Sequence, residues 1–191
     1  MARYTVKFYK GDYVTRQRAA NADKAICYVE QHFNSSSDPQ ANYTHAKVAT
    51  NASKTSKEMA KFYARRVARE FGTDLMFGNG IDAGGRGNGN LRLTAMPAIL
   101  LEPLFASNPA QALVIKSVSG QARLAQCLVD TVEHFFPKGG LVAFSVGHKY
   151  KRSHPSDRGA SVVGGGNEAD YAEKVLQKAA ELLAPQDTCE G

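Results

Sequence analysis

Four side chains that can bind a metal ion or transfer a proton stand next to the predicted ends of strands or at the start of a helix. His32 and His148 follow apolar strands, Glu102 ends a third apolar strand, and Glu168 opens a helical pattern. The ends of strands are where sites collect in α/β proteins. Two histidines and one carboxylate form a donor set of catalytic zinc sites, which keep one position for water, and a second carboxylate can serve as general base. These four residues are therefore a candidate zinc site.

Each of these residues, taken alone, also has a purely structural explanation. A single histidine at a strand end, such as His32, more often makes a hydrogen bond than binds a metal, and Glu102 could simply reach water at the edge of a sheet. Glu102 nevertheless follows four apolar residues, where a carboxylate is costly to bury without a partner. This position favours Glu102 as a base with a raised pKa. Alternation along a strand places Glu30, His32 and Asn34 on one face.

The periodicity of apolar residues predicts the elements that must position these side chains. Strands are predicted at residues 4–9, 25–29, 91–94, 98–101 and 141–146. Helices are predicted at residues 15–24, 53–71, 119–136 and 167–183. Because strands alternate with helices, we expect an α/β fold in a single domain, with a mixed, mostly parallel, twisted sheet flanked by helices.

Two segments are predicted to be loops. Residues 34–51 are polar, and His45 within them is expected to be exposed. Residues 78–90 contain six glycines, but neither a G-x-G-x-x-G motif between a strand and a helix nor a G-K-[ST] motif. We interpret them as a flexible loop that could act as a lid, rather than as a phosphate cradle.

The composition fits one globular domain over residues 1–184, followed by a flexible polar tail at residues 185–191. The net charge of +6 favours anionic partners such as nucleic acid, an acidic membrane surface or an anionic cell wall. No apolar run reaches the ~18 residues needed to span a membrane, and the start of the chain does not resemble a secretory signal, so we expect synthesis in the cytoplasm. The three cysteines suggest no disulfide framework.

Two groups of basic residues allow a functional and a plain interpretation. Arg16 and Arg18 lie near the start of the first predicted helix, where they could contact an anionic substrate or form a solvated face. A basic stripe steps by four along the second predicted helix, at Lys57, Lys61, Arg65 and Arg69. Such a stripe suits nucleic acid or an acidic polymer, but a solvated outer face is the favoured interpretation.

Six short segments carry a pattern that extends over nearly the whole chain. They are Val146-Gly147-His148, Arg158-Gly159-Ala160, Asn167-Glu168, residues 15–21, His32-Phe33-Asn34, and residues 96–102 followed by Phe105-Ala106-Ser107-Asn108. Each resembles a segment of the zinc-dependent N-acetylmuramoyl-L-alanine amidases of the amidase type 3 family. In that family they are the Gly-His loop, the first helix with its metal-binding Glu, an Arg-rich helix, a His-x-Asn strand end, and a strand carrying the catalytic Glu.

The order of these segments is rotated relative to the family. The family runs His, Glu, His, Glu along the chain, whereas this chain runs His32, Glu102, His148, Glu168. Moving residues from about Gly140 onward to the front restores the family order. The resemblance therefore implies a circular permutation, with a junction near residues 137–140. Permutation is tolerated at exposed connections because no core contact need change.

The resemblance implies hydrolysis of the amide between N-acetylmuramic acid and L-alanine in peptidoglycan. His32, His148 and Glu168 would bind Zn²⁺, and Glu102 would act as the base. Residues that could contact substrate or support the ligands are Glu30, Asn34, Arg92 and Asn167. The enzyme would be a monomeric phage-type endolysin or another lytic enzyme that acts on the cell wall, with no nucleic acid as partner.

Several points stay open in the sequence. Glu30 stands where the family usually has Ser, so it could be a partner of His32 or a rival ligand. His154 could be mistaken for the ligand His148. A zinc peptidase that cleaves peptidoglycan stem peptides would share the same ligands, and a non-enzymatic module that binds polyanions would need none of them.

Overall fold

The computed structural model describes residues 3–184 of the chain. The predicted flexible tail of residues 185–191, with Cys189, lies outside the described residues. Cys27 and Cys127 are both buried and unpaired. Within residues 3–184, no helix combines the length and the apolar character that a membrane crossing requires.

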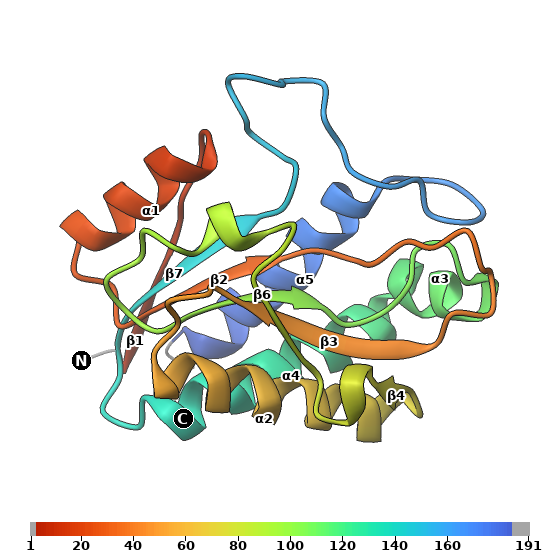
Figure 1. Ribbon diagram of the computed structural model, residues 1–191, viewed down its shortest axis with the longest axis horizontal. Coiled ribbons are helices and arrows are strands. Elements are labelled where there is room, and N and C mark those ends of the chain that lie inside the picture. Colours follow the sequence, from red (N-terminus) through yellow and green to blue (C-terminus); the bar gives the residue numbers. More distant parts are fainter. Residues whose placement is uncertain (1–2, 185–191) are drawn as a thin grey trace, which may run out of the picture.

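Seven strands form one mixed sheet in the order β1-β7-β2-β6-β3-β4, with β5 paired to β3 (Figure 1). They are β1 (Tyr4–Phe8), β2 (Cys27–Gln31), β3 (Tyr43–Val48), β4 (Asp74–Leu75), β5 (Ile81–Ala83), β6 (Ala98–Glu102) and β7 (Gly140–Val146). Strands β1, β7, β2 and β6 are parallel, and β3 is antiparallel to β6. The predicted α/β fold with a mixed, mostly parallel sheet in a single domain is confirmed.

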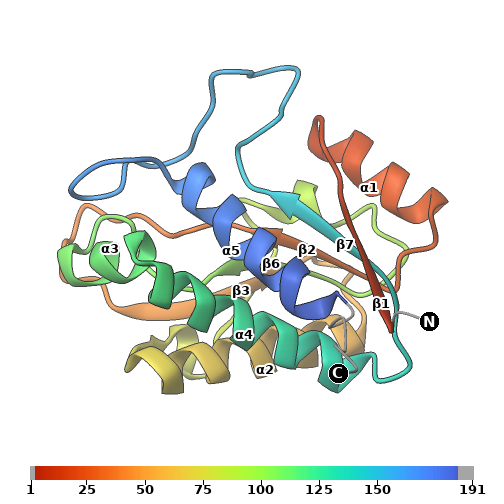
Figure 2. The same cartoon turned by 180° about the vertical axis from the view of Figure 1, so that it is seen from behind.

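Helices cover both faces of this sheet. They are α1 (Tyr13–Ala22), α2 (Lys54–Phe71), α3 (Pro109–Lys116), α4 (Val118–Phe135) and α5 (Glu168–Leu183), with 3₁₀ turns η1 (Met76–Gly78) and η2 (Asn88–Asn90). Figures 1 and 2 show α2, α4 and α5 on one face and α1 on the other. Their packing follows from their apolar faces: Met59, Tyr63 and Val67 of α2, spaced by four residues, are all buried.

The two faces of β6 illustrate how the sheet separates two cores. Ile99 and Leu101 point into the larger core under α2, α4 and α5. Ala98 and Leu100 point into the smaller one, which also contains Ala20 of α1. Because side chains alternate along a strand, a strand covered on both faces must be apolar throughout, as this one is up to Glu102.

Part of the predicted loop at residues 34–51 is wrong, because β3 lies within it. Thr44, Ala46 and Val48 are buried on one side of this strand, but its polar flanks conceal the alternation. Strand β3 is stabilised by long-range pairing with β6 and with β5, and the latter lies in the glycine-rich segment of residues 78–90. That segment therefore contains β5 and η2 rather than being one long loop.

Two further differences concern short elements. The strand predicted at residues 91–94 is wrong: the amides of Arg92 and Thr94 bond to the nearby carbonyls of Asn88 and Leu91, which makes consecutive turns. Helix α3 was not predicted. It begins after Asn108, whose side chain caps it by accepting hydrogen bonds from the amides of residues 110 and 111.

Candidate metal centre

Three neighbouring parallel strands bring the predicted site residues to one edge of the sheet. Strands β7, β2 and β6 lie side by side and end at the same edge, where His148, His32 and Glu102 follow or end them. Glu168 arrives from the other side of the long connection between β7 and α5, as the first residue of α5. This edge is the place where α/β sheets commonly form their sites.

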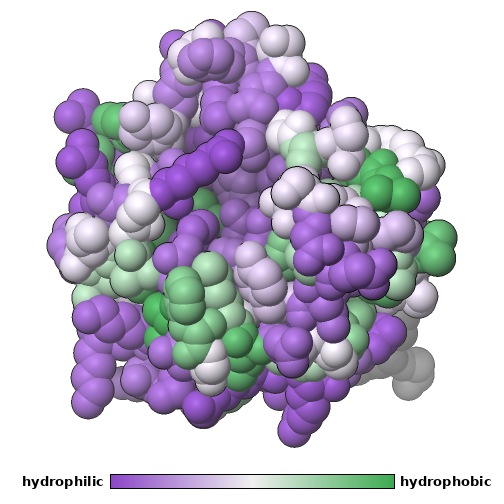
Figure 3. Space-filling model, turned by 45° about the vertical axis from the view of Figure 1, so that its right-hand side comes forward, coloured by the Kyte–Doolittle hydropathy of each residue, from purple (hydrophilic) through white to green (hydrophobic). Residues whose placement is uncertain are grey.

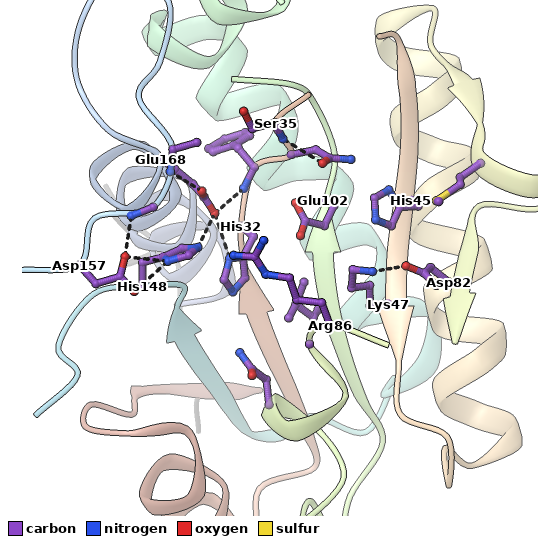
Figure 4. Close-up of a pocket in the computed structure, with 18 of the residues that line it drawn as sticks. His32, Ser35, His45, Lys47, Asp82, Arg86, Glu102, His148, Asp157 and Glu168 are labelled. Atoms are coloured by element: carbon purple, nitrogen blue, oxygen red, sulfur yellow. Dashed lines mark hydrogen bonds and ion pairs between the residues drawn. The ribbon is translucent and has the colours of Figure 1, made fainter. Parts of the chain in front are cut away.

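His32, His148 and Glu168 converge on one point. One ligand atom from each lies within 4.8 Å of the others. Nδ1 of His32 is 2.9 Å from Oε1 of Glu168, and Nε2 of His148 is 3.3 Å from the same oxygen (Figure 4). The imidazole rings meet edge to face, with their centroids 4.9 Å apart. The structure thus brings together the three side chains that the sequence selected as metal ligands.

Backbone amides hold the Glu168 carboxylate in place. The amide of Phe33 donates to Oε1 over 3.2 Å, and the amide of Ala160 donates to Oε2 over 2.9 Å. Although burial favours the protonated acid, hydrogen bonds from both histidines outweigh it and lower the pKa of Glu168 well below its usual range. The carboxylate is therefore ionised and fixed, as a metal ligand must be.

Glu30 supports His32 from behind. Its Oε1 lies 3.0 Å from Nε2 of His32 and also accepts from the side chain of Asn90 over 2.5 Å. Its Oε2 accepts a hydrogen bond from the Tyr28 hydroxyl and lies 3.6 Å from Nη1 of Arg16. Because both oxygens are engaged away from Glu168, Glu30 is arranged as a partner of His32 and not as a rival ligand. Such a partner fixes the tautomer that leaves Nδ1 available to a metal.

Asp157 supports His148 in the same way, and no sequence pattern singles it out. Nδ1 of His148 lies 2.9 Å and 3.0 Å from the two carboxylate oxygens of Asp157, which also pairs with Lys151 over 2.7 Å. His148 itself adopts a left-handed backbone (φ 62°), which costs a non-glycine residue on the order of 1 kcal/mol. His154 is exposed, bonds to Ser153 and takes no part in the cluster.

Two glycines make room for this arrangement. A Cβ atom on Gly147 would overlap the ring of His32, and one on Gly159 would overlap the carboxylate of Glu168. Gly159 also has a positive φ of 72°. The close approach of His32, His148 and Glu168 therefore requires glycine at these positions.

The three candidate ligands open onto a cavity of about 680 Å³. Glu102 lines the same cavity from β6, together with Asn34 and Arg86. The face of the molecule shown in Figure 3 is hollowed, and the walls of the hollow are mainly hydrophilic. Burial raises the pKa of Glu102 to about 7, and its Oε2 has no hydrogen-bond partner in the described chain. The predicted raised pKa is thus present, and a carboxyl group with a pKa near neutrality suits a general base.

His45 is buried, contrary to the sequence prediction, with 3% of its surface exposed. It stands opposite Glu102 in the antiparallel register of β3 and β6 and lines the cavity. Burial, with Lys47 nearby, lowers the pKa of His45 to about 4, so the imidazole is neutral at physiological pH. Its Nδ1 is buried without a hydrogen-bond partner among residues 3–184. His45 is buried rather than exposed because it belongs to β3, a strand that the sequence pattern does not predict.

Of the other residues that the sequence analysis selected, some line the cavity and others do not. Asn34 lines the cavity, whereas Asn167 and Arg92 lie outside its lining. Asn167 precedes α5 without a capping side-chain bond, and Arg92 is exposed on the turns after η2. Arg16 is buried against Glu30 and Ser145, so it belongs neither to a solvated face nor to the cavity; Arg18 is exposed.

The donor set fits Zn²⁺. Two imidazole nitrogens and a carboxylate oxygen are ligands of catalytic zinc, and each histidine has a carboxylate partner on its other nitrogen. The same carboxylates favour a proton on His32 when no metal is bound. Although burial disfavours the charged imidazolium, hydrogen bonds with Glu168 and Glu30 raise the pKa of His32 to about 10. All three ligands face the cavity, which leaves access for water and substrate.

Comparisons with known proteins show the family to which the chain belongs. The sequence profile of the family described as N-acetylmuramoyl-L-alanine amidase matches residues 3–134. Among solved structures, the catalytic domain of CwlV, an N-acetylmuramoyl-L-alanine amidase from Bacillus (Paenibacillus) polymyxa var. colistinus, matches with a TM-score of 0.55 and 30% identity. The N-acetylmuramoyl-L-alanine amidase from Clostridium difficile 630 matches with a TM-score of 0.58 and 23% identity. No curated protein matches the chain.

The extent of these matches is limited. Each of the two structures is covered over 66% of its own length and over 66% of this chain, just under two thirds. The second match, at 23% identity, bears on the fold alone. The profile, in contrast, spans well over half of the chain, and its matched residues include His32 and Glu102. The chain belongs to the N-acetylmuramoyl-L-alanine amidase family.

Proposed function

We propose that this protein is a zinc-dependent peptidoglycan hydrolase that cleaves the amide between the lactyl group of N-acetylmuramic acid and L-alanine. The observation that carries the proposal is the convergence of His32, His148 and Glu168 at the edge where β6 presents Glu102. Family membership supplies the reaction, and the donor set and the raised pKa of Glu102 supply the groups that it needs.

The mechanism assigns one task to each side chain. His32, His148 and Glu168 would hold Zn²⁺, which would supply a water of lowered pKa and polarise a carbonyl oxygen. Glu30 and Asp157 keep the two imidazoles oriented. Glu102 takes a proton from the attacking water and passes it to the departing nitrogen of alanine. The cavity between them admits the sugar–peptide junction of the substrate.

The chain order is that of a circular permutation, with its junction at residues 137–140 within a single catalytic domain. The family profile stops at residue 134, before β7, yet β7 lies inside the sheet between β1 and β2. The end of α5 packs near β1, so a short connection between them would restore the family order (Figure 2). The proposal explains why two metal ligands lie beyond the matched residues.

The net charge of +6 would attract the enzyme to an anionic cell wall. In this proposal it works there as a monomer, for example as a phage-type endolysin. Such attraction should weaken as salt screens the charges. Of the alternatives, a zinc peptidase acting on stem peptides would use the same ligands but cleave another bond. A polyanion-binding module would need neither the metal nor Glu102.

Metal content and product analysis test this proposal together. Purified wild type should contain about one zinc per chain, and His148→Ala should contain far less, because one ligand is removed. Mass spectrometry of digested peptidoglycan should show free lactyl groups and new alanine amino termini. Products in which every lactyl–alanine bond is intact would favour the peptidase, and wild type without zinc would refute the metal site. Exposed His154→Ala is the matched control and should keep both zinc and activity.

A further inference from the structure

Arg86 lines the cavity and, within residues 3–184, has no ionic partner. Three lysine or arginine residues line the cavity. Lys47 pairs with Asp82, and Lys151 pairs with Asp157, so their charges are balanced within the protein. Arg86 forms no salt bridge or side-chain hydrogen bond with any residue between 3 and 184, and Figure 4 shows its side chain extending into the cavity on the side of His32.

The segment that carries Arg86 is fastened at both ends. Before it, Ala83 pairs with Val48, and the amide of Gly84 donates to the Val48 carbonyl over 3.0 Å. After it, the side chain of Asn90 donates to Glu30 over 2.5 Å. The same glutamate contacts His32. Arg86 is exposed to solvent, but the turn that carries it is anchored on both sides.

The chemistry of the substrate indicates what this guanidinium would meet. In the intact amide the lactyl carboxyl group of muramic acid is already used, so the sugar side carries no charge. The stem peptide, by contrast, keeps free carboxylates after alanine. A substrate carboxylate entering this cavity would meet Arg86 as a cation whose charge no carboxylate among residues 3–184 balances, because Lys47 and Lys151 are already paired. A guanidinium binds carboxylate through two parallel hydrogen bonds.

We propose that Arg86 binds a carboxylate of the stem peptide on the departing side of the scissile amide, and so makes the enzyme selective for an acidic residue directly after alanine. This inference rests on the proposed amidase function and specifies its substrate class. Arg86 acts here as a specificity residue, since it contacts the peptide and not the reacting bond.

Two synthetic muramyl tripeptides with amidated C-termini test the proposal. They differ only in whether the residue after alanine carries a free carboxylate or the corresponding carboxamide. Zinc-loaded wild type should cleave the carboxylate with a kcat/KM about ten-fold higher or more, mainly through KM, since a hydrogen bond to a charged group is worth that much. Arg86→Gln should reduce this ratio to about one, with its zinc content unchanged.

The matched control is Arg92→Gln, an exposed arginine six residues further on that lies outside the cavity, and it should retain the wild-type ratio. Arg86→Lys should keep part of the preference, because the charge remains but the planar fork is lost. An Arg86→Gln enzyme that keeps the wild-type ratio, or a wild type with no preference for the carboxylate, would overturn the inference and leave the amidase function standing. Wild type that cleaves neither tripeptide nor peptidoglycan would refute both.

Discussion

Oε1 of Glu30 lies 3.0 Å from Nε2 of His32, while Nδ1 of the same ring faces Glu168 at 2.9 Å. The imidazole is thus clamped between two carboxylates, one of which is a candidate ligand. Because Glu30 occupies Nε2, only Nδ1 is directed to the metal position. Asp157 makes the equivalent contact with Nδ1 of His148, so the two histidines use opposite nitrogens toward the metal.

Glu30→Gln should weaken zinc binding about 10- to 100-fold, because the neutral amide orients and polarises His32 less well. It should also lower the melting temperature of the zinc-free protein, since Arg16 then keeps its buried charge without the carboxylate. Competition with a chromophoric chelator measures the affinity. Asp82→Asn, at a cavity carboxylate that pairs with Lys47, should leave zinc affinity unchanged. Equal affinities in all three proteins would show that Glu30 does not support the ligand.

Glu102→Gln should reduce kcat by about 10²- to 10⁴-fold with zinc content unchanged, because the amide cannot accept a proton from water. Peptidoglycan turnover and metal analysis of the same preparation measure the two quantities. If zinc is lost together with activity, Glu102 is a ligand and not the base.

The same variant has a pH signature in the zinc-free protein. Burial raises the pKa of Glu102 from 4.5 to about 7, so the folded state holds this proton more tightly than the unfolded state. The resulting stability is fully present below about pH 4.5 and is lost as the pH rises through about 7, by up to about 3 kcal/mol. Glu102→Gln should therefore gain stability relative to wild type between pH 4.5 and pH 8 in chelator-treated urea denaturation. A difference that is independent of pH would contradict the buried carboxyl.

Gly147→Ala should lose most of its zinc, because the added methyl group would overlap the ring of His32 and push it from the metal position. Gly89→Ala is the matched control: neither glycine has a positive φ, and a Cβ at residue 89 would meet Tyr13 at an ordinary 3.5 Å. Metal analysis after gel filtration compares the two. Full zinc occupancy in Gly147→Ala would mean that His32 is not held as described.

A rearranged chain tests the circular permutation. It would begin at Gly140, run to Ala184, and continue through a flexible linker into residues 3–136. We expect it to fold, bind zinc and cleave peptidoglycan at near wild-type rates, because no core contact changes. As a control, a chain opened inside α4, between Leu128 and Val129, should fail to fold, since these residues are buried. Failure of both chains alike would count against the permutation.

Much of the fold could be predicted from local patterns. The four-residue spacing of Met59, Tyr63 and Val67 requires one apolar helical face, and the apolar run before Glu102 requires a strand covered on both sides. Strand β3 escaped prediction because its stability comes from pairing with β6, which lies some fifty residues away. His45 was consequently placed on the surface, although it is buried beside the cavity.

The sequence by itself determined which side chains can perform the chemistry, because donor type and position at an element end are local properties. On that basis it selected His32, His148, Glu168 and Glu102. Only the tertiary structure decided how these groups are used. The convergence of His32 and Glu168 depends on a contact between elements far apart in the chain. The carboxylate partners of His32 and His148, and the lack of an ionic partner for Arg86 among residues 3–184, also depend on how the side chains are packed. Hydrogen-bond geometry and burial are properties of the packed molecule, and no spacing along the chain encodes them.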